Sequence, residues 1–229
     1  MGANGSGKSS LLNAVSGLVR PAAGTVRFDG RPITEVPTHR LLGLGLAHVL
    51  ERRRLFPFLS VLDNVLFTME ILRRNDRAAH ERARNLLHLV GLSEFLTARP
   101  HQLSGGMQQR VALCRALIHQ PKLLLMDEPF GALDELTRLE MNDLLLRIRR
   151  ETGASVLFVT HSVPEAVYLS DKVVVFSRRP ARVVKEIAVM LAYPRQQRLR
   201  FTPAFNETER IASEALGVLA PATEEMSAP

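Results

Sequence analysis

The sequence is poor in the residues that several protein classes depend on. It contains one cysteine, Cys114, two tyrosines and no tryptophan in 229 residues. A single cysteine excludes an internal disulfide framework and favours a reducing compartment. The scarcity of tyrosine and tryptophan leaves little material for an aromatic platform on which single-stranded nucleic acid could stack. We therefore expect no nucleic-acid partner.

Long hydrophobic runs are also missing, since none approaches the roughly 18 residues of a membrane-spanning helix. The polar, glycine-rich start is unlike a signal peptide. Apolar residues make up 46% and charged residues 23% of a 25.5 kDa chain, enough for one sizeable core. The net charge of +7 suits a phosphate ligand, nucleic acid or an anionic membrane, but clusters such as Arg195, Arg198 and Arg200 are most simply a solvated basic surface. The composition favours a soluble cytosolic protein.

Short apolar runs alternate with helical patterns along the chain, which is typical of an α/β protein with a parallel sheet. We expect strands over 25–28, 45–50, 122–126, 155–159 and 172–176. A helical stretch over 61–103 interrupts the alternation and predicts an inserted helical subdomain. The core would then comprise residues 1–60 and 104–200, and residues 201–229 would form a partly disordered C-terminal tail.

Residues 2–9 read Gly-Ala-Asn-Gly-Ser-Gly-Lys-Ser, which is the spacing of a phosphate-binding P-loop. Glycines let the backbone curve so that several N–H groups point into one concavity, and the following helix directs its positive end there. Lys8 can reach the terminal phosphates, and the Ser9 hydroxyl can bind Mg²⁺. Taken alone, the motif could also be a chance glycine-rich turn.

A second motif, Leu123-Leu124-Leu125-Met126-Asp127-Glu128, ends a buried strand in two carboxylates. Asp127 would enter the Mg²⁺ shell, and Glu128 would act as general base toward the attacking water. Between the two motifs, Ser104-Gly105-Gly106 begins a helix, where free N–H groups, a hydroxyl and the helix dipole offer a second anion site. Acidic strand ends and Ser-Gly-Gly turns are individually common, but their joint occurrence with a P-loop favours ATP hydrolysis.

With these motifs the chain closely resembles the nucleotide-binding subunit of an ABC transporter over residues 2–200. The resemblance implies an α/β fold, with a P-loop NTPase core and an inserted α-helical subdomain. It also implies a head-to-tail dimer, formed with a second copy or a related ATPase, in which each ATP lies between the P-loop of one subunit and the Ser-Gly-Gly signature of the other. ATP and Mg²⁺ would be the cofactors. The partners would be membrane permease subunits and, indirectly, a periplasmic solute-binding protein, at the cytoplasmic face of the cell membrane.

The resemblance also assigns roles to individual residues. ATP binding in cis falls to Gly2, Asn4, Gly5, Gly7, Lys8, Ser9 and Ser10. ATP binding in trans falls to Ser104, Gly105, Gly106, Gln108 and Asp134. Metal binding falls to Ser9, Asp127 and Glu51, and catalysis to Glu128 and His161. Without the family pattern, His161 would be read as an ordinary histidine at a strand end.

The sequence departs from the family pattern at two places. Met1 directly precedes Gly2, so the strand that normally leads into the P-loop and the aromatic residue that stacks on adenine are missing. We expect that the natural protein starts further upstream or that this chain is an inactive truncated fragment. Position 51 holds Glu51 where the family usually has glutamine, and a carboxylate could still face the metal.

The two halves resemble different importer subgroups. Met126–Asp134 and Phe176–Pro180 look like the nitrate, sulfonate and taurine group, whereas residues 24–61 are similar to branched-chain amino acid importers. We expect a nitrate-, sulfonate- or taurine-like anion as the transported solute, with a branched-chain amino acid next. A non-transport ABC ATPase acting on nucleic acid or the ribosome is the alternative. The segment Phe56-Pro57-Phe58 either receives a helix of the membrane subunit or packs in the helical subdomain.

Overall fold

A computed structural model describes residues 1–2, 5–50 and 55–218. Asn4 and Glu51, two of the expected site residues, lie outside these described residues. The chain divides into two compact units. We call residues 9–159 the sheet unit, and residues 1–8 together with 160–229 the hairpin unit.

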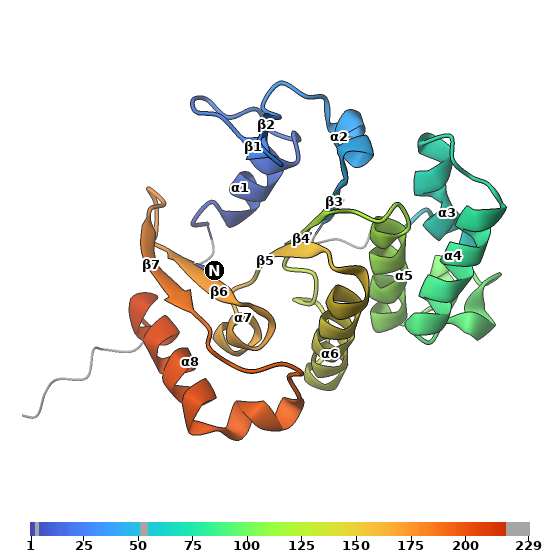
Figure 1. The fold of residues 1–229 in the computed structure, drawn as a ribbon. Helices are drawn as coiled ribbons and strands as arrows, with labels where there is room; N and C mark the ends of the chain where they lie inside the picture. Colours follow the sequence, from blue (N-terminus) through green and yellow to red (C-terminus); the bar gives the residue numbers. More distant parts are fainter. Residues whose placement is uncertain (3–4, 51–54, 219–229) are drawn as a thin grey trace, which may run out of the picture. The chain divides into compact units, whose positions relative to one another are not determined.

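The sheet unit is built on a three-stranded parallel sheet in the order β3-β4-β5 (Figure 1). These strands span Leu46–Val49, Leu123–Asp127 and Ser155–Val159, so three of the expected strands are confirmed. In the register, Val49 lies opposite Met126, and Asp127 lies opposite Val159. Because the carboxyl ends of parallel strands meet at one edge, β4 delivers Asp127 to the edge where ligands bind in open α/β sheets.

One face of this sheet is covered by α1 (Lys8–Val15) and α2 (Thr38–Leu44). Leu12 of α1 and Leu41 of α2 pack in one buried cluster with Leu125 of β4. The short strands β1 (Arg27–Phe28) and β2 (Arg31–Pro32) form an antiparallel pair closed by a turn at Asp29 and Gly30, both with positive φ.

The helical character expected for 61–103 is confirmed. It comprises α3 (Val61–Ile71), α4 (Arg77–Leu89) and the 3₁₀ turns η1 (Ser93–Phe95) and η2 (Pro100–Gln102). The side chains of Ser60 and Asp76 cap the two α-helices. Figure 1 shows α3 and α4 beyond α5 (Gly105–Leu117), against which both pack.

The helix α6 (Glu135–Thr152) completes the sheet unit and ends at Gly153 in the left-handed conformation. Immediately before α6, the Phe130 ring packs against Phe158 of β5, with ring centroids 5.7 Å apart. This contact anchors the loop after Glu128 to the sheet.

The hairpin unit contains α7 (Val163–Leu169), β6 (Lys172–Phe176), β7 (Val183–Ala188), the 3₁₀ turn η3 (Gln197–Phe201) and α8 (Pro203–Ala215). The expected strand over 172–176 is present as β6. However, it pairs antiparallel with β7, a strand that the sequence pattern did not predict. The tight turn over 177–182 returns the chain directly, so no crossover helix is needed.

Residues 203–215, assigned above to a C-terminal tail, form the helix α8. Phe205 and Ala212 are buried where α8 packs against α7, β6 and β7. The charged and alanine-rich composition of this segment is that of an amphipathic helix, in which a narrow apolar stripe makes the contacts with the rest of the fold. The disorder expected for 221–229 lies outside the described residues.

Arg195 corrects the expectation of a solvated basic cluster. Its side chain is buried, and Nη1 donates to the carbonyl oxygens of Tyr168 at 2.8 Å and Ser170 at 2.9 Å. Carbonyl groups at the end of a helix lack intrahelical partners, so Arg195 satisfies the C-terminus of α7.

Across the described ranges, no helix combines the length and the hydropathy that crossing a membrane requires.

Candidate ATP-binding site

The P-loop begins in the hairpin unit, where Gly2 forms a parallel bridge with Phe176 at the end of β6. The Lys8 ammonium donates to the Gly2 carbonyl oxygen at 2.7 Å, which closes the loop on itself. Gly5 and Gly7 have φ of +79° and +90°. Residues with a Cβ rarely adopt this conformation, so both positions need glycine for the curve of the loop.

Ser9 opens the sheet unit on α1, and its hydroxyl donates to Oδ1 of Asp127 at 3.1 Å. Asp127 is only 6% exposed, whereas Ser9 is exposed. Thus a hydroxyl and a carboxylate meet at the carboxyl edge of the sheet. Oxygen ligands of this kind suit Mg²⁺, which is typically held by one or two carboxylates together with substrate phosphates.

The described residues contain no group of three or more His, Cys, Asp and Glu side chains arranged to hold a metal ion. One hydroxyl and one carboxylate, as Ser9 and Asp127 supply, suit an ion that takes its remaining ligands from a nucleotide and water.

Glu128 follows Asp127 in a constrained backbone conformation. Its φ is +42°, which is uncommon for a residue with a side chain. Two hydrogen bonds hold it there: its N–H donates to the Val159 carbonyl at 3.0 Å, and its own carbonyl accepts from Gly131 at 3.2 Å. Such conformations cost of order 1–3 kcal/mol and cluster at functional sites.

The signature segment begins α5. The Ser104 hydroxyl accepts from the Met107 N–H at 3.3 Å and caps the helix. A Cβ added at Gly106 would lie 2.7 Å from Cγ2 of Thr137 in α6, so the first turns of α5 and α6 are in close contact. The side-chain Nε2 of Gln108 donates to the carbonyl oxygens of Pro100 and Leu103. These bonds tie the preceding loop to α5.

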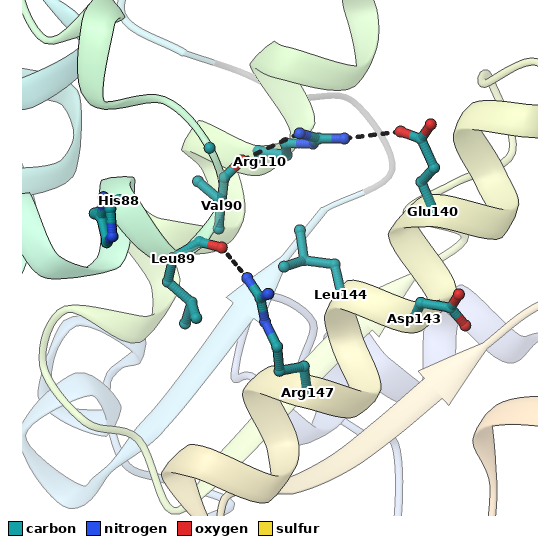
Figure 2. Close-up of a pocket in the computed structure, with 9 residues that line it drawn as sticks. His88, Leu89, Val90, Arg110, Glu140, Asp143, Leu144 and Arg147 are labelled. Carbon is teal, nitrogen blue, oxygen red and sulfur yellow. Dashed lines mark hydrogen bonds and ion pairs between the residues drawn. The ribbon is translucent and has the colours of Figure 1, made fainter. Parts of the chain in front are cut away.

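An open groove of about 680 Å³ separates α6 from the end of α4 (Figure 2). Two arginines bridge it. Arg110 of α5 donates to the Val90 carbonyl at 3.1 Å and pairs with Glu140 of α6 at 3.0 Å, and Arg147 of α6 donates to the Leu89 carbonyl. The Arg110–Glu140 pair joins α5 to α6, and the bonds to the Leu89 and Val90 carbonyls join both helices to the end of α4.

Asp134 caps α6, because its Oδ1 accepts from the Thr137 N–H at 3.0 Å. This hydrogen bond is the main reason that the pKa of Asp134 lies below its ordinary value. Asp134 is therefore an ionised helix cap at the start of α6, the helix that contacts Gly106.

In the hairpin unit, His161 is exposed in the short segment between β5 and α7. The hydroxyl of its neighbour Thr160 donates to the buried carboxylate of Glu165 and accepts from the Ser162 N–H at 3.0 Å. This network fixes the backbone on both sides of His161.

The structure thus brings together Ser9 with Asp127, and Gly2 with Lys8. The helix start at 104–106 meets the α6 turn that Asp134 caps. The sequence analysis did not predict the hydrogen bonds of Thr160 and Glu165 beside His161, because no motif marks these two residues. A second contact that the sequence did not predict is the 2.6 Å hydrogen bond from Arg179 to the Gly5 carbonyl. Arg179 lies in the segment Phe176–Pro180, which was noted above only for its resemblance to one importer subgroup.

A model of the family described as "ABC transporter" matches residues 1–131. The chain belongs to the ABC transporter family. The match includes the P-loop, the signature segment and the carboxylates that end β4.

Similar sequences support this membership. The chain is 47% identical over 184 residues to the taurine import ATP-binding protein TauB of Rhizobium johnstonii, covering 80% of this chain and 68% of the relative. It is 45% identical over 199 residues to the aliphatic sulfonates import ATP-binding protein SsuB 1 of Xanthomonas axonopodis pv. citri, covering 86% and 76% of the two chains.

Among solved structures, the ATP-binding cassette MJ0796, a dimer in a post-hydrolysis state bound to ADP and Pi, matches with a TM-score of 0.70 and 31% identity. The alignment covers 84% of both chains. The ABC ATPase fold expected from the sequence, with its P-loop NTPase core, is confirmed, and this ABC family member is an ATPase.

Proposed function

We propose that this ABC ATPase is the ATP-binding subunit of an importer and that Gly2–Ser9, Asp127 and Glu128 form the cis half of its ATP site. The observation that carries the proposal is the 3.1 Å hydrogen bond between Ser9 and Asp127. It joins the residue that completes the P-loop motif to the carboxylate that ends β4, 118 positions away in sequence.

Ser9 and Asp127 are the residues that would hold Mg²⁺, and Glu51 is proposed as a further carboxylate toward the metal. When bound, Mg²⁺ neutralises charge that develops on the phosphates. Lys8 would exchange its bond to the Gly2 carbonyl for the terminal phosphates. Gly2, Asn4, Gly5, Gly7 and Ser10 would complete the phosphate contacts in cis.

Glu128 is proposed as the general base that accepts a proton from the attacking water. Its fixed backbone supports this role, because a base must be held within hydrogen-bond reach of the proton it accepts. His161 is proposed to act on the γ-phosphate side, and the Thr160–Glu165 network would position it.

The second half of each site would come from a partner in a head-to-tail dimer. The first N–H groups of α5 have no intrahelical partners, so the turn at Ser104, Gly105 and Gly106 can receive an anion. Asp134 begins the neighbouring helix, and Gln108 would act by shaping the signature turn as well as by reaching the nucleotide. The dimeric state of the MJ0796 structure supports this arrangement.

The proposed solute is a taurine- or sulfonate-like anion, because relatives over 40% identical carry taurine and aliphatic sulfonate import names. Partner permease subunits would place the chain on the cytoplasmic face of the membrane, with a periplasmic binding protein as an indirect partner. Phe58, which is 84% exposed, is proposed to meet a permease helix. Phe56 is instead engaged within the fold, with its ring centroid 4.3 Å from that of Phe67.

Coexpression with the permease and binding-protein subunits of a taurine importer that lacks its own ATPase tests the proposal. We expect the chain to support uptake of radiolabelled taurine and the Lys8→Ala chain to fail. Uptake of leucine, but not taurine, with a branched-chain amino acid permease would overturn the solute assignment. Failure to copurify with any permease would overturn the importer role.

A further inference from the structure

The turn between β6 and β7 is closed by its own hydrogen bonds. The Ser177 N–H donates to the Arg182 carbonyl at 2.9 Å, and the Arg182 N–H donates to the Ser177 hydroxyl at 3.0 Å. The same hydroxyl donates within the turn, where the Arg178 carbonyl lies 2.8 Å away. The turn is therefore an ordered platform for the side chains it carries.

This turn lies against the P-loop within the hairpin unit. At the base, the Phe176 N–H donates to the Met1 carbonyl at 2.9 Å, next to the bridge between Phe176 and Gly2. Further along, Nε of Arg179 donates to the Gly5 carbonyl at 2.6 Å. A Cβ built on Gly7 would lie 3.9 Å from Cβ of Ala181. The turn thus meets the loop at Gly5 and Gly7, and the end of β6 pairs with the start of the loop.

The bond to Gly5 fixes the orientation of one P-loop peptide group. In a trans peptide, the C=O and the following N–H point in opposite directions. A donor held on the Gly5 carbonyl therefore turns the Ser6 N–H away from Arg179. An anion-binding loop works by aiming successive N–H groups into one concavity, so a peptide that cannot rotate lowers the ordering cost of phosphate binding.

The positive charge of the β6–β7 turn suits a phosphate ligand as well. Positions 178, 179 and 182 are all arginine, and residues 177–184 contain no acidic residue. Of the two neighbouring arginines, Arg179 is the one whose side chain donates to a described P-loop carbonyl.

We propose that Arg179 is a positioning residue for nucleotide binding: it holds the P-loop through the Gly5 carbonyl in the shape that receives the phosphates. The β6–β7 turn is then a second structural element of the nucleotide site, in the same subunit as the P-loop. The inference rests on the proposed role of Gly2–Ser9 as the phosphate-binding loop.

The test is titration of the full chain with Mg-ATP, comparing Arg179→Ala with Arg178→Ala. Both variants remove one positive charge from the same turn, but only the first removes the bond to Gly5. A hydrogen bond from a charged group contributes about 1.5–3 kcal/mol, so we expect Arg179→Ala to raise the Kd about tenfold or more. Arg178→Ala should raise it less than threefold, as expected of a screened surface charge.

Two further measurements separate positioning from a general structural effect. Arg179→Lys keeps a donor for the single bond to Gly5, and we expect it to restore most of the affinity. In ATPase assays, Arg179→Ala should raise KM while kcat at saturating ATP and Tm stay near those of the unaltered chain. A fall in kcat and Tm with unchanged KM would overturn the proposal.

Equal losses in Arg178→Ala and Arg179→Ala would show that charge alone matters and would overturn the inference. So would an unchanged Kd in Arg179→Ala, which would make Arg179 a solvated surface residue. In either case the unaltered chain would bind Mg-ATP and Lys8→Ala would not, so the P-loop assignment would stand. If Lys8→Ala binds Mg-ATP as tightly as the unaltered chain, the P-loop assignment and this inference both fail.

Discussion

Gly106→Ala is expected to destabilise the protein through a clash that a second substitution relieves. The added Cβ would lie 2.7 Å from Cγ2 of Thr137. Carbon atoms in favourable contact lie about 3.5–4.0 Å apart, so the overlap is about 1 Å. Overpacking of this kind costs about 1–3 kcal/mol. The better helix propensity of alanine returns at most about 1 kcal/mol, so we expect a net loss of about 1–2 kcal/mol.

Thr137→Ser removes the clashing methyl group and retains both the hydroxyl and the N–H that Asp134 caps. We therefore expect Gly106→Ala/Thr137→Ser to be at least as stable as Thr137→Ser alone. Urea unfolding of the four proteins measures the coupling between the two positions. An equal cost of Gly106→Ala in both backgrounds would refute the packing explanation.

The ATPase rates of the same four proteins address the role of this glycine. Recovery of both stability and activity in the double variant would mean that Gly106 serves the contact between α5 and α6. Recovery of stability alone would mean that the glycine is also needed at the nucleotide.

Three further outcomes are expected. Arg195→Met should lower the free energy of unfolding by about 3 kcal/mol, because it leaves the carbonyls at the end of α7 without their charged donor, as urea unfolding would show. Burial lowers the pKa of His48 and His119. The unfolded chain therefore binds more protons, and stability should fall as the pH drops below about 6.5, less so in His119→Leu when unfolding is compared at pH 7 and pH 5. Mixing Lys8→Ala with Ser104→Arg should give ATPase activity that neither variant shows alone, because one composite site of the mixed dimer stays intact; full activity of Ser104→Arg by itself would contradict the composite site.

Much of the sheet unit could be predicted because its signals are local. Apolar runs marked β4 and β5. The spacing of Ala83, Leu86, Leu87 and Val90 predicted one buried face for the α4 segment; Ala83, Leu87 and Val90 are at most 2% exposed, whereas Leu86 is only partly buried. The P-loop and the carboxylate pair were found because phosphate and metal chemistry demand particular residues at fixed spacing.

The hairpin unit was harder to predict because its contacts join distant segments. Arg195 looks like its neighbours Arg198 and Arg200 in the sequence, yet it is buried because α7 ends 26 positions earlier and needs a donor there. The antiparallel pairing of β6 and β7 depends on a turn without the usual glycine signal. The contact of Arg179 with Gly5 spans 174 positions, and no local pattern encodes it.

In the proposed mechanism, Glu128 is the general base for hydrolysis of the nucleotide held by the P-loop and Asp127. The most direct test is Glu128→Gln, which keeps the shape of the side chain and the two backbone hydrogen bonds that fix residue 128. Mg-ATP binding should stay within about threefold of the unaltered chain, while the hydrolysis rate should fall by about 10²–10⁴, and the ATP-bound dimer should accumulate in size-exclusion chromatography. A Glu128→Gln protein that stays monomeric and hydrolyses ATP at the normal rate would contradict the claim.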